Sequence, residues 1–358
     1  MRILCLLPDS LEVPLPTTAK RIIPLMKKVE KRGHHIEFKE NVARKKGRPG
    51  EYTYFLSRLN YTLSSVLREA FSDYDIVFVS KPEMLPLAYL LSKKLSIPFV
   101  QDLDDLEKIS VLDLHGCFSS VLIMTAAKVF VASNELYRLY ERKIKNVIYL
   151  PNTTDLQYFN PEKYGNIKKT REPTFLWVSD RIDWFTGCKL VFNSFARLKF
   201  GRLVIIGGGP KAFFEKTAKK LGMEKQVTVK GWVSDSELLR LYISSDIGLM
   251  PFTDNLWTRC KCSSRLFELM AMELPFICTV GEPAYMAKKL GCGIIAKPEP
   301  EDFTVKMKCA IDYLDELTES ARQGREYLLE KQNFDVLADR LERELYMASK
   351  VKNARAAG

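Results

Sequence analysis

The sequence predicts an α/β protein with two Rossmann-like, doubly wound domains facing a cleft. Short continuous apolar runs alternate with longer amphipathic patterns along the chain, which is typical of parallel strands covered by helices on both faces. The runs form two consecutive sets of about six, and a polar segment divides the sets. The length of 358 residues also exceeds the comfortable size of one hydrophobic core.

In the first half, helical periodicity at residues 18–32 and 84–95 separates the apolar runs. Because parallel strands need a crossover connection, this alternation favours βαβ units. The predicted strands lie at residues 2–8, 34–40, 75–80, 97–103, 129–133 and 146–151.

The second half repeats this organisation after the polar segment 152–173, which is predicted to be the interdomain linker. A helical pattern at 189–198 lies between its first two strands, and an amphipathic helix over 333–349 ends the pattern. The predicted strands lie at residues 174–179, 202–209, 226–232, 247–252, 275–280 and 291–297. Doubly wound sheets bind ligands at the carboxyl ends of their strands, so functional residues are expected there.

The net charge of +11 is unevenly placed, since residues 17–68 hold thirteen basic side chains and four acidic ones. An anionic membrane surface or an anionic acceptor is the natural partner of such a stretch, and a solvated basic face is the alternative. No nucleic acid is expected as a partner, because no stacking or groove-reading motif accompanies the charge.

No apolar run approaches the roughly 20 residues that span a bilayer, and the opening "MRILCLLPDS" lacks the pattern of a signal peptide. The eight cysteines are scattered, mostly within apolar runs, which is typical of buried thiols in a reducing compartment. We therefore expect a cytoplasmic protein, peripheral at the inner face of the membrane if the basic stretch binds it. Because Cys260 and Cys262 lack a second pair and the chain has three histidines, no metal site is expected.

The segment "RLVIIGGGPKAFFEK" reads as a strand, a glycine turn and a helix start, a pattern that lets backbone N–H groups approach a phosphate. Gly207, Gly209 and Ala212 fit the dinucleotide fingerprint G-x-G-x-x-A. That fingerprint needs an acidic residue about 20 positions later, and the next strand ends instead in Lys230 and Gly231. An NAD site is therefore not expected, and a tight turn without ligand is the alternative.

Two further strand ends carry charged side chains. Arg181 follows the strand 174–179, where its fork suits a diphosphate, although pairing with Asp180 or Asp183 would equally explain it. In the first half, "PFVQDLDDLEKI" places Asp104 and two further aspartates at a strand end. These carboxylates suit a metal or a base acting on a hydroxyl, and turn formation is the alternative.

The segment "KCSSRLFELMAMELPFICT" starts a helix at Ser263 or Ser264, next to the cations Lys261 and Arg265. Cations and N–H groups suit a diphosphate, and Glu268, one turn into the helix, suits the vicinal hydroxyls of a sugar. The alternative is a solvated first turn in which Glu268 complements the helix dipole.

Five blocks follow one another along the chain: "KRGHHIEF", "VIYLPNTTDLQYFNP", "LVIIGGGP", "VTVKGWVSDSELLRLYISSDIGLMPF" and "RLFELMAMELPFICT". In order and spacing they resemble the retaining family 4 (group 1) glycosyltransferases of GT-B fold, and the resemblance covers essentially the whole chain. The last block resembles the segment K-L-x-E-x-M-A-x-G-x-P-V-V of that family.

The resemblance implies an acceptor-binding domain over 1–158, on which the helix 333–350 packs back, and a nucleotide-sugar-binding domain over 159–332. It implies catalytic roles for Arg181, Lys261 and Asp104, with Glu268 holding the ribose. The donor-binding residues expected from the resemblance and the motifs together are Gly208, Gly209, Trp232, Val233, Asp254, Asn255, Ser263, Ser264, Arg265 and Glu268.

Several departures from the family concern the expected site, besides Thr153 and Thr154 in the second block and a missing glycine pair after the first strand. Cys260 stands where a first glutamate often contacts the donor hexose, Thr186 where a lysine partner of Arg181 is usual, and Asp104 where a histidine is common. The string "DNLWTRCKCSSR" resembles a subgroup in which Asp254, Asn255, Lys261 and Arg265 would take over contacts to the hexose and the phosphates.

The expected function is hexosyl transfer, of EC 2.4 type, from a nucleoside-diphosphate sugar to a hydroxyl acceptor with retention. The acceptor would be a glycan or a lipid-linked molecule, and the reaction would need no cofactor and no metal. The alternatives are a catalytically silent GT-B subunit that binds nucleotide sugars, and a UDP-sugar 2-epimerase.

Overall fold

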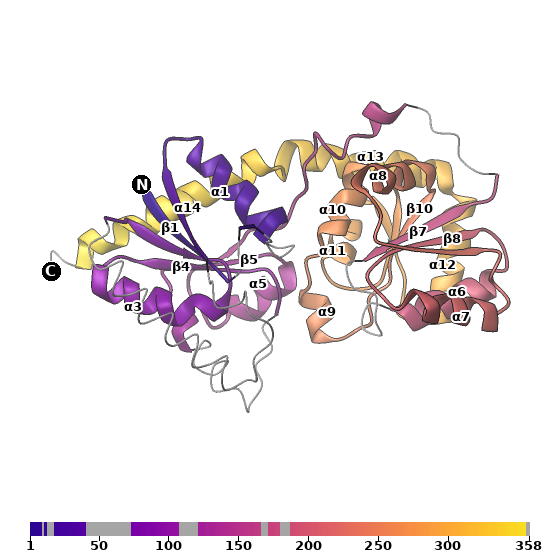
Figure 1. Cartoon of the computed structure of the whole chain (residues 1–358), viewed down its shortest axis with the longest axis horizontal. Helices are drawn as coiled ribbons and strands as arrows, with labels where there is room; N and C mark the ends of the chain where they lie inside the picture. Colours follow the sequence, from indigo (N-terminus) through magenta and orange to yellow (C-terminus); the bar gives the residue numbers. More distant parts are fainter. Residues whose placement is uncertain are drawn as a thin grey trace. The chain divides into compact units, whose positions relative to one another are not determined.

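The computed structural model describes residues 1–8, 11–12, 18–40, 73–106, 121–165, 171–179 and 187–355 (Figure 1). The chain divides into two compact units, of which the first comprises Met1–Pro151 together with Phe334–Gly358 and the second comprises Asn152–Asn333. The described residues of each unit form a six-stranded sheet with parallel pairing. The prediction of two Rossmann-like, doubly wound α/β domains is therefore confirmed.

The sheet of the first unit has the strand order β2-β1-β3-β4-β5-β6. Its strands are β1 (Arg2–Leu7), β2 (His35–Glu40), β3 (Ile76–Val79), β4 (Phe99–Leu103), β5 (Lys128–Val131) and β6 (Val147–Tyr149). Its helical elements are η1 (Thr18–Ile22), α1 (Ile23–Glu30), η3 (Pro82–Met84), α3 (Leu85–Leu95), α5 (Asn134–Glu141) and α14 (Phe334–Arg355). Helices α1 and α14 cover one face of the sheet, and α3 and α5 lie on the other (Figure 1).

Helix α14 is part of the core of the first unit although it comes last in the chain. Leu337, Leu341 and Leu345 are almost fully buried, in one cluster with residues of α1 and β1. Charge pairs flank this apolar seam: Lys28 pairs with Asp335 at 2.8 Å, Arg32 with Glu342 at 3.0 Å, and Lys128 with Glu344.

The basic stretch 17–68 is only partly described, because residues 41–72 lie outside the described residues. Within the described part, Lys28 and Arg32 pair with acidic side chains of α14, and Arg21 is buried. These three side chains therefore serve the first unit itself rather than a solvated basic face. Among the described residues, no helix combines the length and the apolar character needed to cross a bilayer.

The sheet of the second unit has the order β12-β11-β10-β7-β8-β9, so the direction of strand succession reverses between β7 and β10. Its strands are β7 (Thr174–Ser179), β8 (Arg202–Gly207), β9 (Val227–Gly231), β10 (Ile247–Met250), β11 (Phe276–Cys278) and β12 (Gly293–Ile295). Its helical elements are η4 (Pro161–Tyr164), α6 (Cys188–Leu198), α7 (Lys211–Lys220), α8 (Asp235–Ser244), α9 (Leu256–Cys260), α10 (Ser264–Ala271), α11 (Glu282–Leu290), α12 (Pro300–Asp312) and α13 (Leu314–Lys331).

Helices α6, α7 and α12 cover one face of this second sheet, and α8, α10, α11 and α13 lie on the other (Figure 1). Because helices cover both faces, the central strands are apolar throughout, and every residue of β10 is buried.

The first part of the predicted linker packs into the second unit instead of bridging through solvent. Thr153 and Phe159 are buried, and the buried Arg325 of α13 donates from Nη1 to the carbonyl oxygens of Phe159 at 3.0 Å and Ala271 at 2.6 Å. Arg325, distant in sequence, thus satisfies the backbone carbonyl oxygen of Phe159 in this segment.

Two glycines let the loops at the carboxyl edge of the second sheet approach each other closely. Gly187, at φ 83°, lies so near the chain after β10 that an added Cβ would fall 1.5 Å from the carbonyl oxygen of Pro251. Gly207, at φ 124°, would place a Cβ 1.7 Å from the carbonyl oxygen of Ser179. Only glycine fits at these two positions.

We expect Gly187→Ala to lower the free energy of unfolding of the second unit by about 2–5 kcal/mol, from backbone strain plus the clash with Pro251. The control is Gly222→Ala, because Gly222 also has a positive φ, of 71°, but has no atom within 4 Å of an added Cβ; its cost should stay at about 1–2 kcal/mol. Urea unfolding of both variants measures the difference, and equal losses would contradict the close approach.

Candidate functional site

The carboxyl edge of the second sheet, at the reversal between β7 and β10, is where a doubly wound fold binds ligands. The loop after β7 begins at residue 180, and Arg181 and Thr186 lie outside the described residues. The loop after β10 runs through the short helix α9 to the start of α10. This loop carries most of the predicted charged residues of the site.

Glu268 lies on α10 with only 1% of its surface exposed, and two side chains donate to its carboxylate. The Tyr242 hydroxyl, from α8, donates to Oε2 at 2.8 Å, and Arg265 Nη1 donates to the same oxygen at 2.6 Å. Burial raises the pKa of the Tyr242 hydroxyl, and the nearby Glu268 carboxylate raises it further, so Tyr242 stays protonated and donates. The alternative of a solvated first turn is wrong for Glu268 and Arg265, because both are buried.

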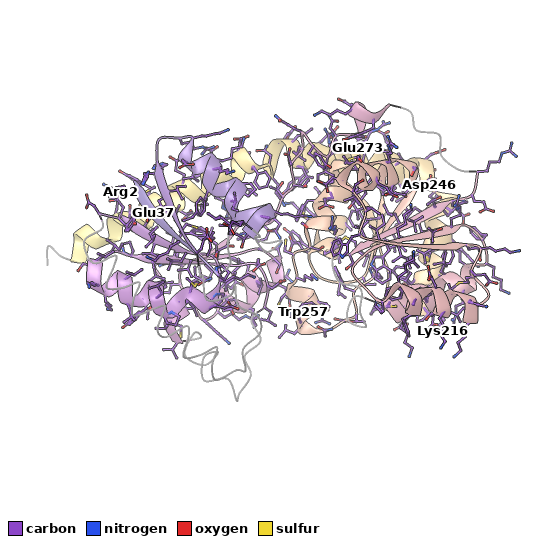
Figure 2. All side chains as sticks on the ribbon, in the orientation of Figure 1. Arg2, Glu37, Lys216, Asp246, Trp257 and Glu273 are labelled. Carbon is purple, nitrogen blue, oxygen red and sulfur yellow. The ribbon has the colours of Figure 1, made fainter. Side chains whose placement is uncertain are left out.

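Lys261 is held differently from Arg265. Its ammonium group lies over two aromatic rings, 4.9 Å from the ring centroid of Trp257 and 5.7 Å from that of Phe252. Such distances are typical of cation–π contacts. The side chain of Trp257 projects from α9 (Figure 2).

Asp254 and Asn255 shape α9 itself. The Asn255 side chain accepts a hydrogen bond from the backbone of Thr258 at 3.0 Å, and the Thr258 hydroxyl accepts one from the backbone of Asn255 at 3.2 Å, which forms a capping box. Asp254 accepts from Arg259 Nη2 at 2.8 Å, and this hydrogen bond lowers the pKa of the Asp254 carboxyl. Asp254 and Asn255, the two predicted hexose-binding residues, thus both form hydrogen bonds within this loop.

Four helices follow strands at this edge: α6, α7, α10 and α11 come after β7, β8, β10 and β11 in the chain. Their N-cap residues make no side-chain hydrogen bond to the first turn; these are Gly187, Pro210, Ser263 and Gly281. Ser263 is therefore the N-cap of α10 by position, whereas the predicted side-chain cap is not formed. Backbone N–H groups at helix starts attract anions, so this edge suits a diphosphate.

The remaining donor-binding candidates of the second unit lie near the same edge. Gly208 and Gly209 form the bend between β8 and α7, and Ser264 opens α10. Trp232 and Val233 follow β9, and Trp232 is 68% exposed. An exposed indole at a strand end offers a flat surface to an aromatic base.

In the first unit, Asp104 follows β4 and forms an ion pair with Lys81, which follows the neighbouring strand β3. Asp102 is fully buried and accepts from Arg21 at 2.9 Å (Nε) and 2.6 Å (Nη2). Arg21 also donates to the carbonyl oxygens of Leu150 and Pro151, at 2.8 and 2.9 Å. Asp102 therefore has a structural role, although through a buried ion pair with Arg21, made from within β4, and not through the turn formation given as the alternative.

The described residues contain no group of three or more His, Cys, Asp or Glu side chains arranged to hold a metal ion. Cys260, where the family often has a glutamate, is fully buried at the end of α9. A thiol in that position faces the protein interior.

Sequence reasoning missed the partners of the site residues: Tyr242 for Glu268, Lys81 for Asp104, and the two rings for Lys261. Lys81 could have been found, because it directly follows a predicted strand as Asp104 does. Tyr242 carries no local signal, since 26 residues separate it from Glu268.

Residues 172–312 match the family model described as "Glycosyl transferases group 1". No curated protein matches the chain in sequence. The match covers β7 to α12 and thus includes the whole carboxyl edge of the second sheet.

Solved structures resemble nearly the whole chain at low identity. Sucrose-phosphate synthase from Thermosynechococcus elongatus has a TM-score of 0.79 at 15% identity, covering 97% of this chain and 99% of that one. A glycosyltransferase from Rickettsia africae ESF-5 has a TM-score of 0.78 at 16% identity, covering 97% and 98%. Anabaena Alr3699/HepE, solved in complex with UDP-glucose, has a TM-score of 0.73 at 15% identity, covering 97% and 100%.

These likenesses extend over both units and agree with the two parallel six-stranded sheets. The chain therefore has the two-domain GT-B fold, and its residues 172–312 match the group 1 glycosyltransferase model.

Proposed function

We propose that the protein transfers a hexose from a nucleoside-diphosphate sugar to a hydroxyl acceptor, with retention at the anomeric carbon. One observation carries this proposal. Helix starts whose own N-cap residues form no side-chain hydrogen bond to the first turn gather with Lys261 and the buried Glu268 at one edge, inside the segment that matches a glycosyltransferase model. The complex of the HepE relative with UDP-glucose supports a nucleotide sugar as donor.

In this proposal each group at the edge has its own role. Negative charge develops on the leaving diphosphate, and Lys261, Arg181 and the helix starts would neutralise it without a metal or a cofactor. Glu268 would receive the ribose hydroxyls rather than act as a nucleophile. Because Arg265 already donates to Glu268 at 2.6 Å, we assign it to orienting that carboxylate instead of binding the diphosphate.

The acceptor would bind in the first unit, where Asp104 lies at the carboxyl end of β4. A glycan or a lipid-linked acceptor on the cytoplasmic face of an anionic membrane fits the basic stretch 17–68. Co-flotation with liposomes tests the membrane part of the proposal, and binding that does not depend on acidic lipid would contradict it.

A catalytically silent nucleotide-sugar-binding subunit is the second candidate. Cys260 favours it, because a thiol is only a weak hydrogen-bond acceptor and cannot replace a carboxylate that contacts the hexose. The two functions differ in one result, since the enzyme releases nucleoside diphosphate when donor and acceptor are both present and the silent subunit does not.

A thermal-shift panel of UDP-, GDP-, ADP- and CMP-sugars tests the donor. A ligand that binds the folded state at 100 times its Kd adds about 2.7 kcal/mol of stability, so the matching donor should raise Tm by several degrees. We expect Arg181→Ala to weaken the shift of the best donor. The absence of any shift across the panel would overturn the proposal, and the anomeric configuration of the product, read by NMR, tests retention.

A further inference from the structure

The charges of the loop after β10 do not all balance within the loop. Residues 254–268 hold the three cations Arg259, Lys261 and Arg265 and two carboxylates. Arg259 pairs with Asp254, and Arg265 pairs with Glu268. Within the described part of the chain, no carboxylate lies within ion-pair distance of Lys261, whose charged group lies on the faces of Trp257 and Phe252 instead.

Aromatic rings hold a cation without cancelling its charge. The ring quadrupole attracts the ammonium group, whereas a carboxylate would neutralise it and compete with an incoming anion. Phe252, directly after β10, is 6% exposed, and Trp257 and Lys261 are half-buried. The loop therefore holds Lys261 in place and keeps its full positive charge for a ligand.

The chain braces the elements that carry the rings and the ammonium group. The Asn255–Thr258 capping box fixes the start of α9, and Gly281 packs so closely on the end of α9 that an added Cβ would lie 2.8 Å from the Thr258 carbonyl oxygen. On the other side of Lys261, Asn152 Nδ2 donates to the Cys262 carbonyl oxygen at 2.6 Å. Both ends of the short segment that holds Lys261 are therefore fixed before a ligand arrives.

We propose that Trp257 and Phe252 are positioning residues that hold the Lys261 ammonium group beside the start of α10 for the diphosphate of the donor. When the diphosphate binds, the ammonium group moves from the indole face to the phosphate oxygens, where it forms a charge-assisted hydrogen bond. This inference rests on the proposed function, and it adds the two aromatic residues that position the Lys261 ammonium group for the diphosphate.

The test compares a diphosphate with its nucleoside in the same variant. The probe pair is UDP with uridine, GDP with guanosine, or ADP with adenosine. The pair chosen is the one whose diphosphate raises the Tm of the wild type most. We expect Lys261→Met to weaken diphosphate binding at least tenfold and Trp257→Leu to weaken it about three- to tenfold, while nucleoside binding stays unchanged. Trp257→Phe keeps an aromatic face and should stay within twofold. Partial unfolding of a variant lowers its apparent affinities for the diphosphate and the nucleoside by the same factor. The ratio of these two affinities therefore does not depend on the folded fraction.

A spectroscopic signal separates positioning from structural support. Binding of the diphosphate should change the tryptophan fluorescence of the wild type. The contribution of Trp257 to this change should be absent from the Trp257→Phe and Lys261→Met variants. The matched control is Leu256→Ala on the same helix, because Leu256 is 50% exposed and should leave both affinities unchanged.

Two results overturn the inference, and they are distinguishable. If Trp257→Leu weakens nucleoside and diphosphate equally, or Leu256→Ala has the same effect as Trp257→Leu, the indole only supports α9. If the wild type binds no nucleoside diphosphate at all, the proposed function fails and this inference fails with it.

Discussion

Replacing Glu268 with alanine is expected to lower the free energy of unfolding of the second unit by about 3–5 kcal/mol. The substitution leaves Arg265 buried, with 8% of its surface exposed, and without the carboxylate to which it donates at 2.6 Å. It also removes the acceptor of the buried Tyr242 hydroxyl. Urea unfolding followed by tryptophan fluorescence measures this loss, because all four tryptophans lie between residues 152 and 333.

A double-mutant cycle identifies the cause of the destabilisation. Arg265→Met combined with Glu268→Ala removes both charges and should recover much of the lost stability, whereas Tyr242→Phe alone should cost about 1 kcal/mol. The double variant should fold and still give no thermal shift with donors, because the proposed ribose contact is gone. A double variant as unstable as Glu268→Ala would show that the buried charge is not the cause.

Leu341→Ala is expected to destabilise the first unit by about 2–5 kcal/mol, because it removes a fully buried side chain that packs in one cluster with residues of α1 and β1. Far-UV circular dichroism follows both units, while the tryptophans follow the second unit alone. We therefore expect part of the dichroism transition to move to lower urea and the fluorescence transition to stay.

Met347→Ala is the matched control for this prediction, since Met347 lies on the same helix and is 43% exposed. Its effect should stay within about 0.5 kcal/mol, as for surface substitutions in general. Equal effects of Met347→Ala and Leu341→Ala would contradict the place of α14 in the core.

Most strands could be predicted from the sequence because the central ones, such as β3 and β10, are buried on both faces and therefore read as continuous apolar runs. Each of the twelve predicted runs overlaps one strand, for example β10 within 247–252. The strand order could not be predicted, because it depends on which strands pair and not on local pattern. The packing of the segment after Pro151 could not be predicted for a similar reason, since the contact of Arg325 with the Phe159 carbonyl oxygen joins residues 166 positions apart.

In the candidate site, too, features set by nearby residues could be predicted, and contacts between residues far apart in sequence could not. Lys261, Arg265 and Glu268 could be grouped from their spacing at one helix start. Their different environments could not be predicted, because the partner Tyr242 lies on another helix, and the rings over Lys261 depend on how the loop folds back. The capping box of Asn255 and Thr258 was readable as an N-cap pattern and would have predicted α9.

The place of α14 has a consequence for synthesis on the ribosome. Domains usually fold in the order in which they emerge, the N-terminal one first. Here the helix that completes the first unit is translated after all of Asn152–Asn333. The second unit can therefore fold while the first still exposes the apolar face of α1 and β1 that Leu337, Leu341 and Leu345 later cover. A nascent chain stalled before Phe334 would present that face to chaperones and proteases, because the first unit is completed only after the second has been translated.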